Sequence, residues 1–202
     1  QTFDIAVIGA GAAGMMCAAT AAAGGRSVVL IDHAQKLAEK IRISGGGRCN
    51  FTNRHVTLKN FISANPKFAR GILAAYTPQD FIRLVDAHGI AWHEKHRGQL
   101  FCDESSEQII AMLKRECDRH GVSWRMPCKV ERVTPIAGWY ELWTSAGLIK
   151  TKRLVIATGG TAVPQVGAPD FGLRLAREFG LAVVPPRPAL VPLQFDPAVW
   201  QP

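Results

Sequence analysis

The sequence predicts an α/β protein with a parallel central sheet and a small antiparallel β-meander. The first observation is a βαβ pattern: residues 3–8 and 27–31 are short apolar runs rich in β-branched side chains, and the alanine-rich residues 12–23 between them favour a helix. The second is the buried-strand pattern LVIA at residues 154–157. The third is a series of short strand patterns within residues 123–149, which predicts the meander. Parallel strands joined by a crossover helix imply a layered α/β fold.

Three more helices are expected. The Thr-Pro pair at positions 77–78 is typical of a helix start, and that helix should end at Gly89. Ser105 and Gln108 have the spacing of a capping box, which predicts a second helix. The apolar pattern of residues 171–179 predicts the third.

Residues 36–53 contain several glycines and are interpreted as a long loop, with a short strand near residues 41–43. A composition of 48% hydrophobic residues is enough for a core and excludes a disordered chain. Four prolines within residues 185–192 indicate a linker. We therefore expect one domain over residues 1–188, and a linker with the truncated start of a second domain over residues 189–202.

The composition also limits the partners. Lys and Arg number 24 against 16 Asp and Glu, for a net charge of +8, but the cations form no long run, so a nucleic-acid partner is not the first expectation. The five cysteines have no CxxC pair and no His at metal-ligand spacing, which argues against a metal site and a disulfide framework. The 21 uncharged residues 5–25 are rich in Ala and Gly and follow no basic region, so we expect no membrane partner and a cytoplasmic location.

A glycine pattern lies where a dinucleotide site requires it. Gly9, Gly11 and Gly14 form GxGxxG directly after the first predicted strand and at the start of a helix. In this pattern the helix N-terminus binds a pyrophosphate. Asp32 ends the second strand 18 residues after Gly14, where a carboxylate can accept hydrogen bonds from a ribose. The alternative is an ordinary tight turn and a surface carboxylate.

Two other glycine segments favour a large dinucleotide. Residues 44–50, SGGGRCN, combine three glycines with an arginine, so the backbone can pass close to a flat or anionic ligand. Residues 157–160, ATGG, follow a strand at the end where open α/β sheets bind ligands. Either segment alone is also compatible with a simple loop.

The segments DIAVIGAGAAGMMCA, VVLID, ISGGGRCNFTN, LVIATGG and PALVPL, taken in order, closely resemble bacterial FAD-dependent oxidoreductases of the BaiN-like type. That family includes aminoacetone-oxidase-like members and is distantly similar to fumarate-reductase and tRNA-modifying flavoproteins. The resemblance covers essentially the whole chain, and SGGGRCN followed by Thr-Asn is its specific element.

The resemblance implies a Rossmann-like FAD-binding domain with noncovalent FAD. It implies that Asp32 binds the adenosine ribose, that Val130 approaches the adenine through its backbone, and that Lys40 lies near the pyrophosphate and isoalloxazine. The cofactor-binding residues that it implies are Gly9, Gly11, Ala12, Ala13, Gly14, Asp32, Lys40, Ser44, Gly45, Gly46, Gly47, Arg48, Cys49, Val130, Thr158, Gly159 and Gly160. It identifies no catalytic residue.

The sequence departs from the resembled pattern at two points. Ala38 and Glu39 precede Lys40 where relatives usually have Gly-Arg, so an arginine contact is not carried over to position 39. Relatives also continue for roughly another domain of 100 to 200 residues. We therefore expect an N-terminal part of a longer protein, whose C-terminal part is its own missing partner, and no turnover by these residues alone.

Three polar residues have two readings each. Cys49 beside Arg48 is either a thiolate for redox chemistry or a packing residue near the flavin. His93 and His96 are either acid–base groups or part of a polar surface.

The function expected from these observations is an FAD-dependent oxidoreductase that acts on a small organic substrate, with NAD(P)H as a candidate electron donor. Two alternatives are kept. One is an NAD-dependent dehydrogenase, in which SGGGRCN would have no role. The other is a flavin-containing protein that binds or modifies tRNA, which the charge of +8 would suit.

Overall fold

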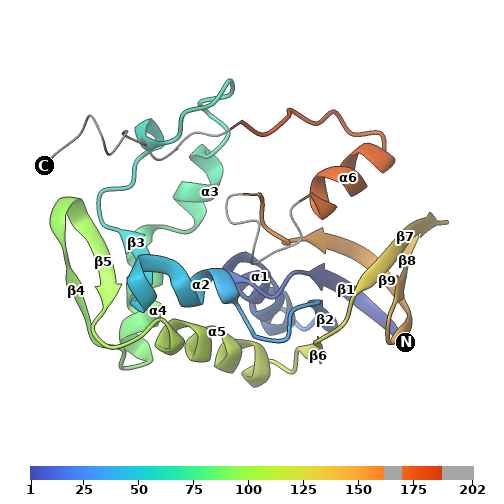
Figure 1. The fold of residues 1–202 in the computed structure, drawn as a ribbon, viewed down its shortest axis with the longest axis horizontal. Helices are drawn as coiled ribbons and strands as arrows, with labels where there is room; N and C mark the ends of the chain where they lie inside the picture. The colour runs from blue at the N-terminus through green and yellow to red at the C-terminus, as the bar shows by residue number, and fades with distance from the viewer. Residues whose placement is uncertain (162–169, 188–202) are drawn as a thin grey trace, which may run out of the picture.

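The computed structural model describes residues 1–161 and 170–187, and its centre is a mixed six-stranded sheet (Figure 1). The strand order is β6-β2-β1-β9-β8-β7. These strands are β1 (Thr2–Ile8), β2 (Val28–Ile31), β6 (Ser123–Arg125), β7 (Val130–Ile136), β8 (Trp139–Thr144) and β9 (Gly147–Ile156). β6, β2, β1 and β9 are parallel, and β8 and β7 are antiparallel. The predicted α/β fold is confirmed, and the meander continues the central sheet through β9.

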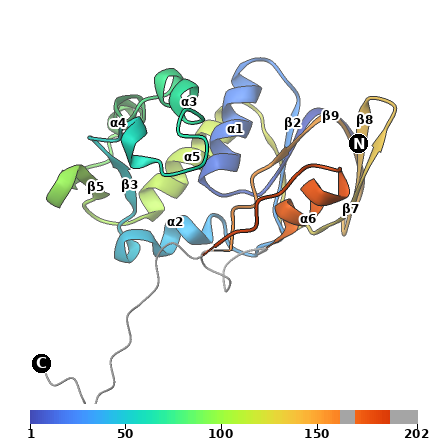
Figure 2. The ribbon, with the colours of Figure 1, turned by 90° about the horizontal axis from the view of Figure 1, so that it is seen from above.

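Helices cover both faces of this sheet (Figure 2). α1 (Ala12–Ala23) and α5 (Glu107–Arg119) lie on one face, and α6 (Phe171–Glu178) lies on the other. The apolar run of β2 explains the two layers, because successive side chains of a strand point to opposite faces. Val28 and Leu30 belong to the core under α1 and α5, whereas Val29 and Ile31 belong to the core under α6. A strand buried on both faces needs such a continuous apolar run.

A second sheet, antiparallel and of order β3-β5-β4, lies on the α4 side of the molecule. Its strands are β3 (Asn50–Asn53), β4 (Trp92–Glu94) and β5 (Gln99–Cys102). α3 (Arg70–Ala75) and α4 (Pro78–Ala87) lie between β3 and β4 in the chain. This sheet joins segments about fifty residues apart, since Asn50 pairs with Phe101.

The expectation of a loop over residues 36–53 with a strand near 41–43 is wrong. α2 (Glu39–Ile43) occupies that place, and a short 3-10 turn (Ser44–Gly47) and β3 follow it. Contacts with α5 hold the helix, because Arg42 forms an ion pair with Glu107 and its carbonyl accepts a hydrogen bond of 2.8 Å from the Ser106 hydroxyl.

The predicted helix starts have different outcomes. At α4 the capping box is present: the Thr77 amide donates to the Asp80 carboxylate at 2.7 Å, and the Asp80 amide donates back to the Thr77 hydroxyl at 3.3 Å. At α5 the expected box between Ser105 and Gln108 is not formed, because the helix begins at Glu107 and the Gln108 amide group donates to Glu104. The helix predicted over residues 171–179 is confirmed as α6.

Part of the predicted domain organisation lies outside the described residues. The boundary at residue 188 and the linker over residues 189–202 belong to that part. Among residues 1–161 and 170–187, no helix has the length and apolar character to cross a membrane. In the same residues no cluster of three or more His, Cys, Asp and Glu side chains could hold a metal ion.

Candidate cofactor site

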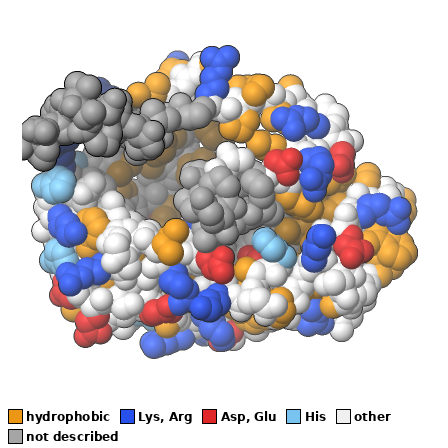
Figure 3. All heavy atoms as spheres, viewed as in Figure 1, with side chains coloured by type: hydrophobic (Ala, Val, Ile, Leu, Met, Phe, Trp, Pro, Cys, Tyr) orange, Lys and Arg blue, Asp and Glu red, His pale blue; other side chains and the backbone are white. Residues whose placement is uncertain are grey.

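A cavity of about 900 Å³ opens at the carboxyl ends of the parallel strands β1, β2 and β9. In Figure 3 the molecule is hollowed, with apolar side chains on the walls of the hollow. The volume is at the upper end of the roughly 300–1,000 Å³ that small-molecule sites occupy. Among the predicted site residues, those that line the cavity are Gly9, Gly11, Ala12, Ala13, Asp32, Lys40, Ser44, Cys49, Val130, Thr158 and Gly159.

The three glycines of the turn between β1 and α1 have different surroundings. Gly9 has φ +108°, and a Cβ there would lie 2.8 Å from the Thr158 nitrogen. A Cβ at Gly14 would overlap the carbonyl oxygen of Gly9, so this glycine lets α1 pack on the turn. A Cβ at Gly11 would have no atom within 4 Å. The open glycine therefore lies at the N-terminus of α1, where free amide groups favour an anion.

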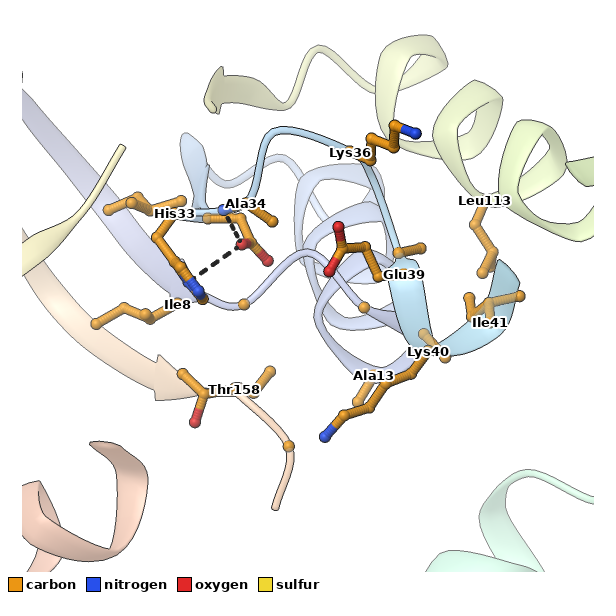
Figure 4. A pocket seen from close by; sticks show the side chains of 18 of the residues that line it. Ile8, Ala13, His33, Ala34, Lys36, Glu39, Lys40, Ile41, Leu113 and Thr158 are labelled. Atoms are coloured by element: carbon orange, nitrogen blue, oxygen red, sulfur yellow. Dashed lines mark hydrogen bonds and ion pairs between the residues drawn. The ribbon is translucent and has the colours of Figure 1, made fainter. Parts of the chain in front are cut away.

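The Asp32 carboxylate is fixed by backbone amides beside this turn. Its Oδ2 accepts a hydrogen bond of 2.6 Å from the Ala10 amide, and its Oδ1 accepts one of 2.8 Å from the Ala34 amide. His33 lies 3.5 Å away through its Nδ1 (Figure 4). The side chain is 17% exposed and lines the cavity, so its remaining lone pairs can accept hydrogen bonds from a ligand there. The positions of Asp32 and the glycine turn agree with a ribose next to a pyrophosphate.

Lys40 connects two walls of the cavity. Its side chain extends from α2 toward the loop that carries Thr158 (Figure 4). The ammonium group donates a hydrogen bond of 2.7 Å to the carbonyl of Gly160. Gly159 has φ +74°, and a Cβ there would lie 3.2 Å from the Lys40 Nζ. The sequence segments around residues 40 and 160 therefore meet across the site.

The SGGGRCN segment forms the next part of the wall. It is held by backbone hydrogen bonds to β5 and α5, from the Cys102 amide to the Arg48 carbonyl at 2.9 Å and from the Ser106 amide to the Gly47 carbonyl at 2.7 Å. Gly46 and Gly47 have φ +67° and +83°, and a Cβ at either would have no atom within 4 Å. These glycines are required by the backbone conformation rather than by packing.

Cys49 does not have the environment of an activated thiolate. The residue is buried, and desolvation raises the pKa of its thiol although a hydrogen bond with Ser44 lowers it. An activated cysteine requires the opposite shift. The structure therefore favours the packing interpretation of Cys49.

Several predicted residues lie away from the cavity lining. Gly14 is buried beneath the turn, and Arg48 is exposed. Gly160 lines a second, smaller cavity of about 330 Å³ together with Gly159. The remaining predicted residues outside the lining are Gly45, Gly46 and Gly47.

Sequence reasoning missed the residues that line the site from β3, α4 and α6. Phe51 and Phe81 line it from β3 and α4, and Phe171 and Arg174 line it from α6. Their signal in the sequence was weak, because single aromatic residues at helix and strand positions look like ordinary core residues.

The predicted histidines lie elsewhere. The His93 Nδ1 is 2.6 Å from an Asp103 oxygen, and its ring stacks on Phe101 at 6.2 Å, but His93 and His96 do not line the cavity. Their role as acid–base groups stays a prediction.

Comparison with known proteins places this arrangement among Rossmann proteins. The family model described as HI0933-like protein Rossmann domain matches residues 3–188. A ribosomal RNA dihydrouridine synthase of Escherichia coli K12 is 48% identical over 192 residues, which are 95% of this chain and 48% of that protein. A 3-dehydro-bile acid delta(4,6)-reductase of Clostridium scindens is 28% identical over 194 residues, 94% of this chain and 47% of that protein.

The chain spans about half the length of the curated relatives it matches. Among solved structures, glycine oxidase from Geobacillus kaustophilus aligns with a TM-score of 0.56 at 14% identity, over 90% of this chain and 59% of that chain. At this identity the likeness shows a shared fold.

Proposed function

The chain belongs to the HI0933-like family, and on that premise we propose that the whole protein is an FAD-dependent reductase that converts uridine to dihydrouridine in ribosomal RNA. The observation that carries the proposal is the 48% identity to a ribosomal RNA dihydrouridine synthase, against 28% to a bile-acid reductase. The proposal follows the alternative of an RNA-modifying flavoprotein, with ribosomal RNA in place of tRNA.

The residues of the cavity fit a dinucleotide such as FAD. The amides at the start of α1, behind the open Gly11, would hold the pyrophosphate, and the Asp32 carboxylate would accept hydrogen bonds from the ribose hydroxyls. Val130 lines the cavity together with Cys128 and Lys129, where the adenine would lie. The SGGGRCN segment supports FAD over NAD, because its Ser44 and Cys49 line the cavity as a second wall that an NAD site would not use.

Reduction of uridine adds a hydride and a proton across the C5–C6 bond of the base. FAD, when bound and reduced, would supply the hydride, and NAD(P)H is the proposed two-electron donor that reduces it again. The contribution of this chain is to hold the dinucleotide at its adenosine and pyrophosphate half, and to present the SGGGRCN wall on the opposite side. The proton donor is not assigned to a residue.

The test uses a strain that lacks the gene. Its ribosomal RNA should lack one dihydrouridine, measured by mass spectrometry of RNA fragments. Purified full-length protein should be yellow with acid-releasable FAD, and with NAD(P)H it should restore the dihydrouridine in that RNA. The matched control is the Asp32→Ala variant, which should restore less dihydrouridine than the wild-type protein at a low FAD concentration because it binds FAD more weakly. Ribosomal RNA that keeps all its dihydrouridine in the deletion strain would refute the proposal, as would a released chromophore other than FAD.

A further inference from the structure

The net charge of the chain arises almost entirely from one segment. Residues 40–79 contain seven Lys and Arg and no Asp or Glu, whereas the other 162 residues contain seventeen Lys and Arg against all sixteen Asp and Glu. The cations of the segment are spaced, so no basic run marks it. The informative signal is the absence of carboxylates over forty residues.

Four cations of this segment are free to meet a ligand. Arg42 pairs with Glu107 and Arg54 pairs with Glu94, but both partners come from other parts of the chain. Within residues 40–79, all of which the structure describes, the exposed Lys and Arg side chains that form no ion pair are Arg48, Lys59, Lys67 and Arg70. By contrast, Lys150 and Lys152 on β9 pair with Glu141 and Asp4.

Large apolar side chains are exposed among the same cations. Phe68 is 73% exposed, Phe61 is 46% exposed and Tyr76 is 42% exposed. Three aromatic rings thus lie within sixteen residues, interleaved with Lys67 and Arg70. We call Lys59, Phe61, Lys67, Phe68, Arg70 and Tyr76 the cation–aromatic surface.

The cation–aromatic surface is continuous with the wall of the cofactor site. Phe51 of β3 precedes the residues of the cation–aromatic surface in the chain and Phe81 of α4 follows them, and both line the cavity. Their rings lie 6.1 Å apart between centroids, so the stretch of chain that carries the surface begins and ends at the cavity wall.

A single-stranded nucleic acid fits this combination. Unpaired cations without neighbouring carboxylates attract phosphates, and exposed rings stack on bases whatever their sequence. An anionic membrane fits less well, because it would need a long amphipathic helix, and α3 has six residues.

We infer that the cation–aromatic surface binds the unpaired nucleotides of the RNA that flank the base entering the cofactor site. The inference deepens the proposed function and rests on it for the identity of the RNA. It assigns a substrate-positioning role to residues that do not line the cavity.

The test measures binding of FAD-loaded full-length protein to ribosomal RNA transcribed in vitro, at several salt concentrations. Replacing Lys59, Lys67 and Arg70 by Ala should lower the slope of log affinity against log salt by about two, since each phosphate contact to a single strand contributes about 0.7. Phe68→Ala should weaken binding by about tenfold through the loss of one stacked base.

A charge-matched control is available outside residues 40–79. Replacing Arg26, Arg115 and Arg153 by Ala removes three exposed cations that form no ion pair and that lie before β2, on α5 and on β9. This variant should keep the wild-type salt slope, and all variants should keep their FAD and their rate of reduction by NAD(P)H.

The outcomes separate the surface from the proposed function. Dihydrouridine formation with unchanged affinity and slope in the Lys59, Lys67 and Arg70 variant overturns the surface but keeps the function. Salt-dependent RNA binding that this variant loses, without any dihydrouridine formed by wild-type protein, keeps the surface but overturns the function.

Two other occupants are also tested. If the rest of the protein covered the surface, Phe68→Cys would resist maleimide labelling in RNA-free full-length protein, and the inference would be wrong. Binding of wild-type protein to phosphatidylglycerol vesicles but not to RNA would overturn it as well. The expected result is rapid labelling that RNA suppresses.

Discussion

The glycine turn Gly9–Gly14 and the glycine run Gly46–Gly47 belong to segments that line the same cavity, but they use glycine for different reasons. At the turn, Gly9 and Gly14 are required because a side chain would collide with backbone atoms of this chain. In the run, Gly46 and Gly47 face open space and need only a left-handed backbone. The turn is therefore fixed by packing within this domain. The run is fixed by its backbone conformation, and its surface stays free for contacts.

The largest expected effect concerns the glycine turn, which packing fixes. Gly14→Ala places a methyl group on the Gly9 carbonyl, so α1 must move away from β1. We expect a loss of about 3 kcal/mol in the free energy of unfolding, typical of severe overpacking. FAD should be absent from the purified full-length variant. Urea unfolding and flavin absorbance measure the two effects, and near-wild-type values for both would contradict the packing argument.

Asp32→Ala should leave the fold intact and weaken the ligand. The change removes the acceptor of the Ala10 and Ala34 amides and of the ribose hydroxyls. A charge-assisted hydrogen bond contributes about 1.5 to 3 kcal/mol, so FAD affinity should fall by about one to two decades. Fluorescence titration of the full-length apoprotein gives the affinity. Asp32→Asn keeps one acceptor oxygen, so its FAD affinity should lie between those of the wild-type protein and Asp32→Ala. An unchanged FAD affinity in both variants would place the ribose elsewhere.

Gly46→Ala tests the glycine run. The new Cβ meets no atom within 4 Å, so only the backbone at φ +67° resists it, at a cost of about 1 kcal/mol. The free energy of unfolding should fall by that amount, measured by urea titration. Gly46→Asn should recover part of it because Asn tolerates this backbone region. A loss of unfolding free energy as large as that of Gly14→Ala would remove the distinction between the turn and the run.

The smallest expected effect concerns the reactivity of Cys49. Because burial raises the pKa of this thiol, the thiolate fraction at pH 7.5 is lower than in an exposed cysteine. Alkylation by iodoacetamide, followed by peptide mass spectrometry, should be slow at that pH and should accelerate as the pH rises. Cys49 that reacts faster than an unfolded-peptide thiol would restore the thiolate interpretation.

The parts of the fold that could be predicted are those that local pattern determines. The βαβ unit follows from two apolar runs and an alanine-rich helix, and α4 follows from the Thr77-Pro78 pair at its start. α2 could not be predicted, because Ile41 and Ile43 alternate as in a strand and the helix depends on contacts with α5. The pairing of β3 with β5 also has no local signal.

The candidate site divides in the same way. Gly9, Gly11 and Asp32 were predictable because one motif places them on consecutive elements. Phe51, Phe81 and Arg174 were not, because each reaches the cavity from an element whose position depends on tertiary packing.

The place of β9 in the sheet affects how the nascent chain folds. β9 is the last of the six strands in sequence, but it lies beside the first, with Thr2 opposite Lys150 and Ile8 opposite Ile156. About 150 residues must be synthesised after β1 before its neighbour exists, which at roughly 5–20 residues per second takes about 8 to 30 s on the ribosome. During that interval one edge of β1 has no native partner, and such an edge is a template for pairing with other chains. This edge of β1 therefore stays open to non-native pairing until synthesis has passed β9.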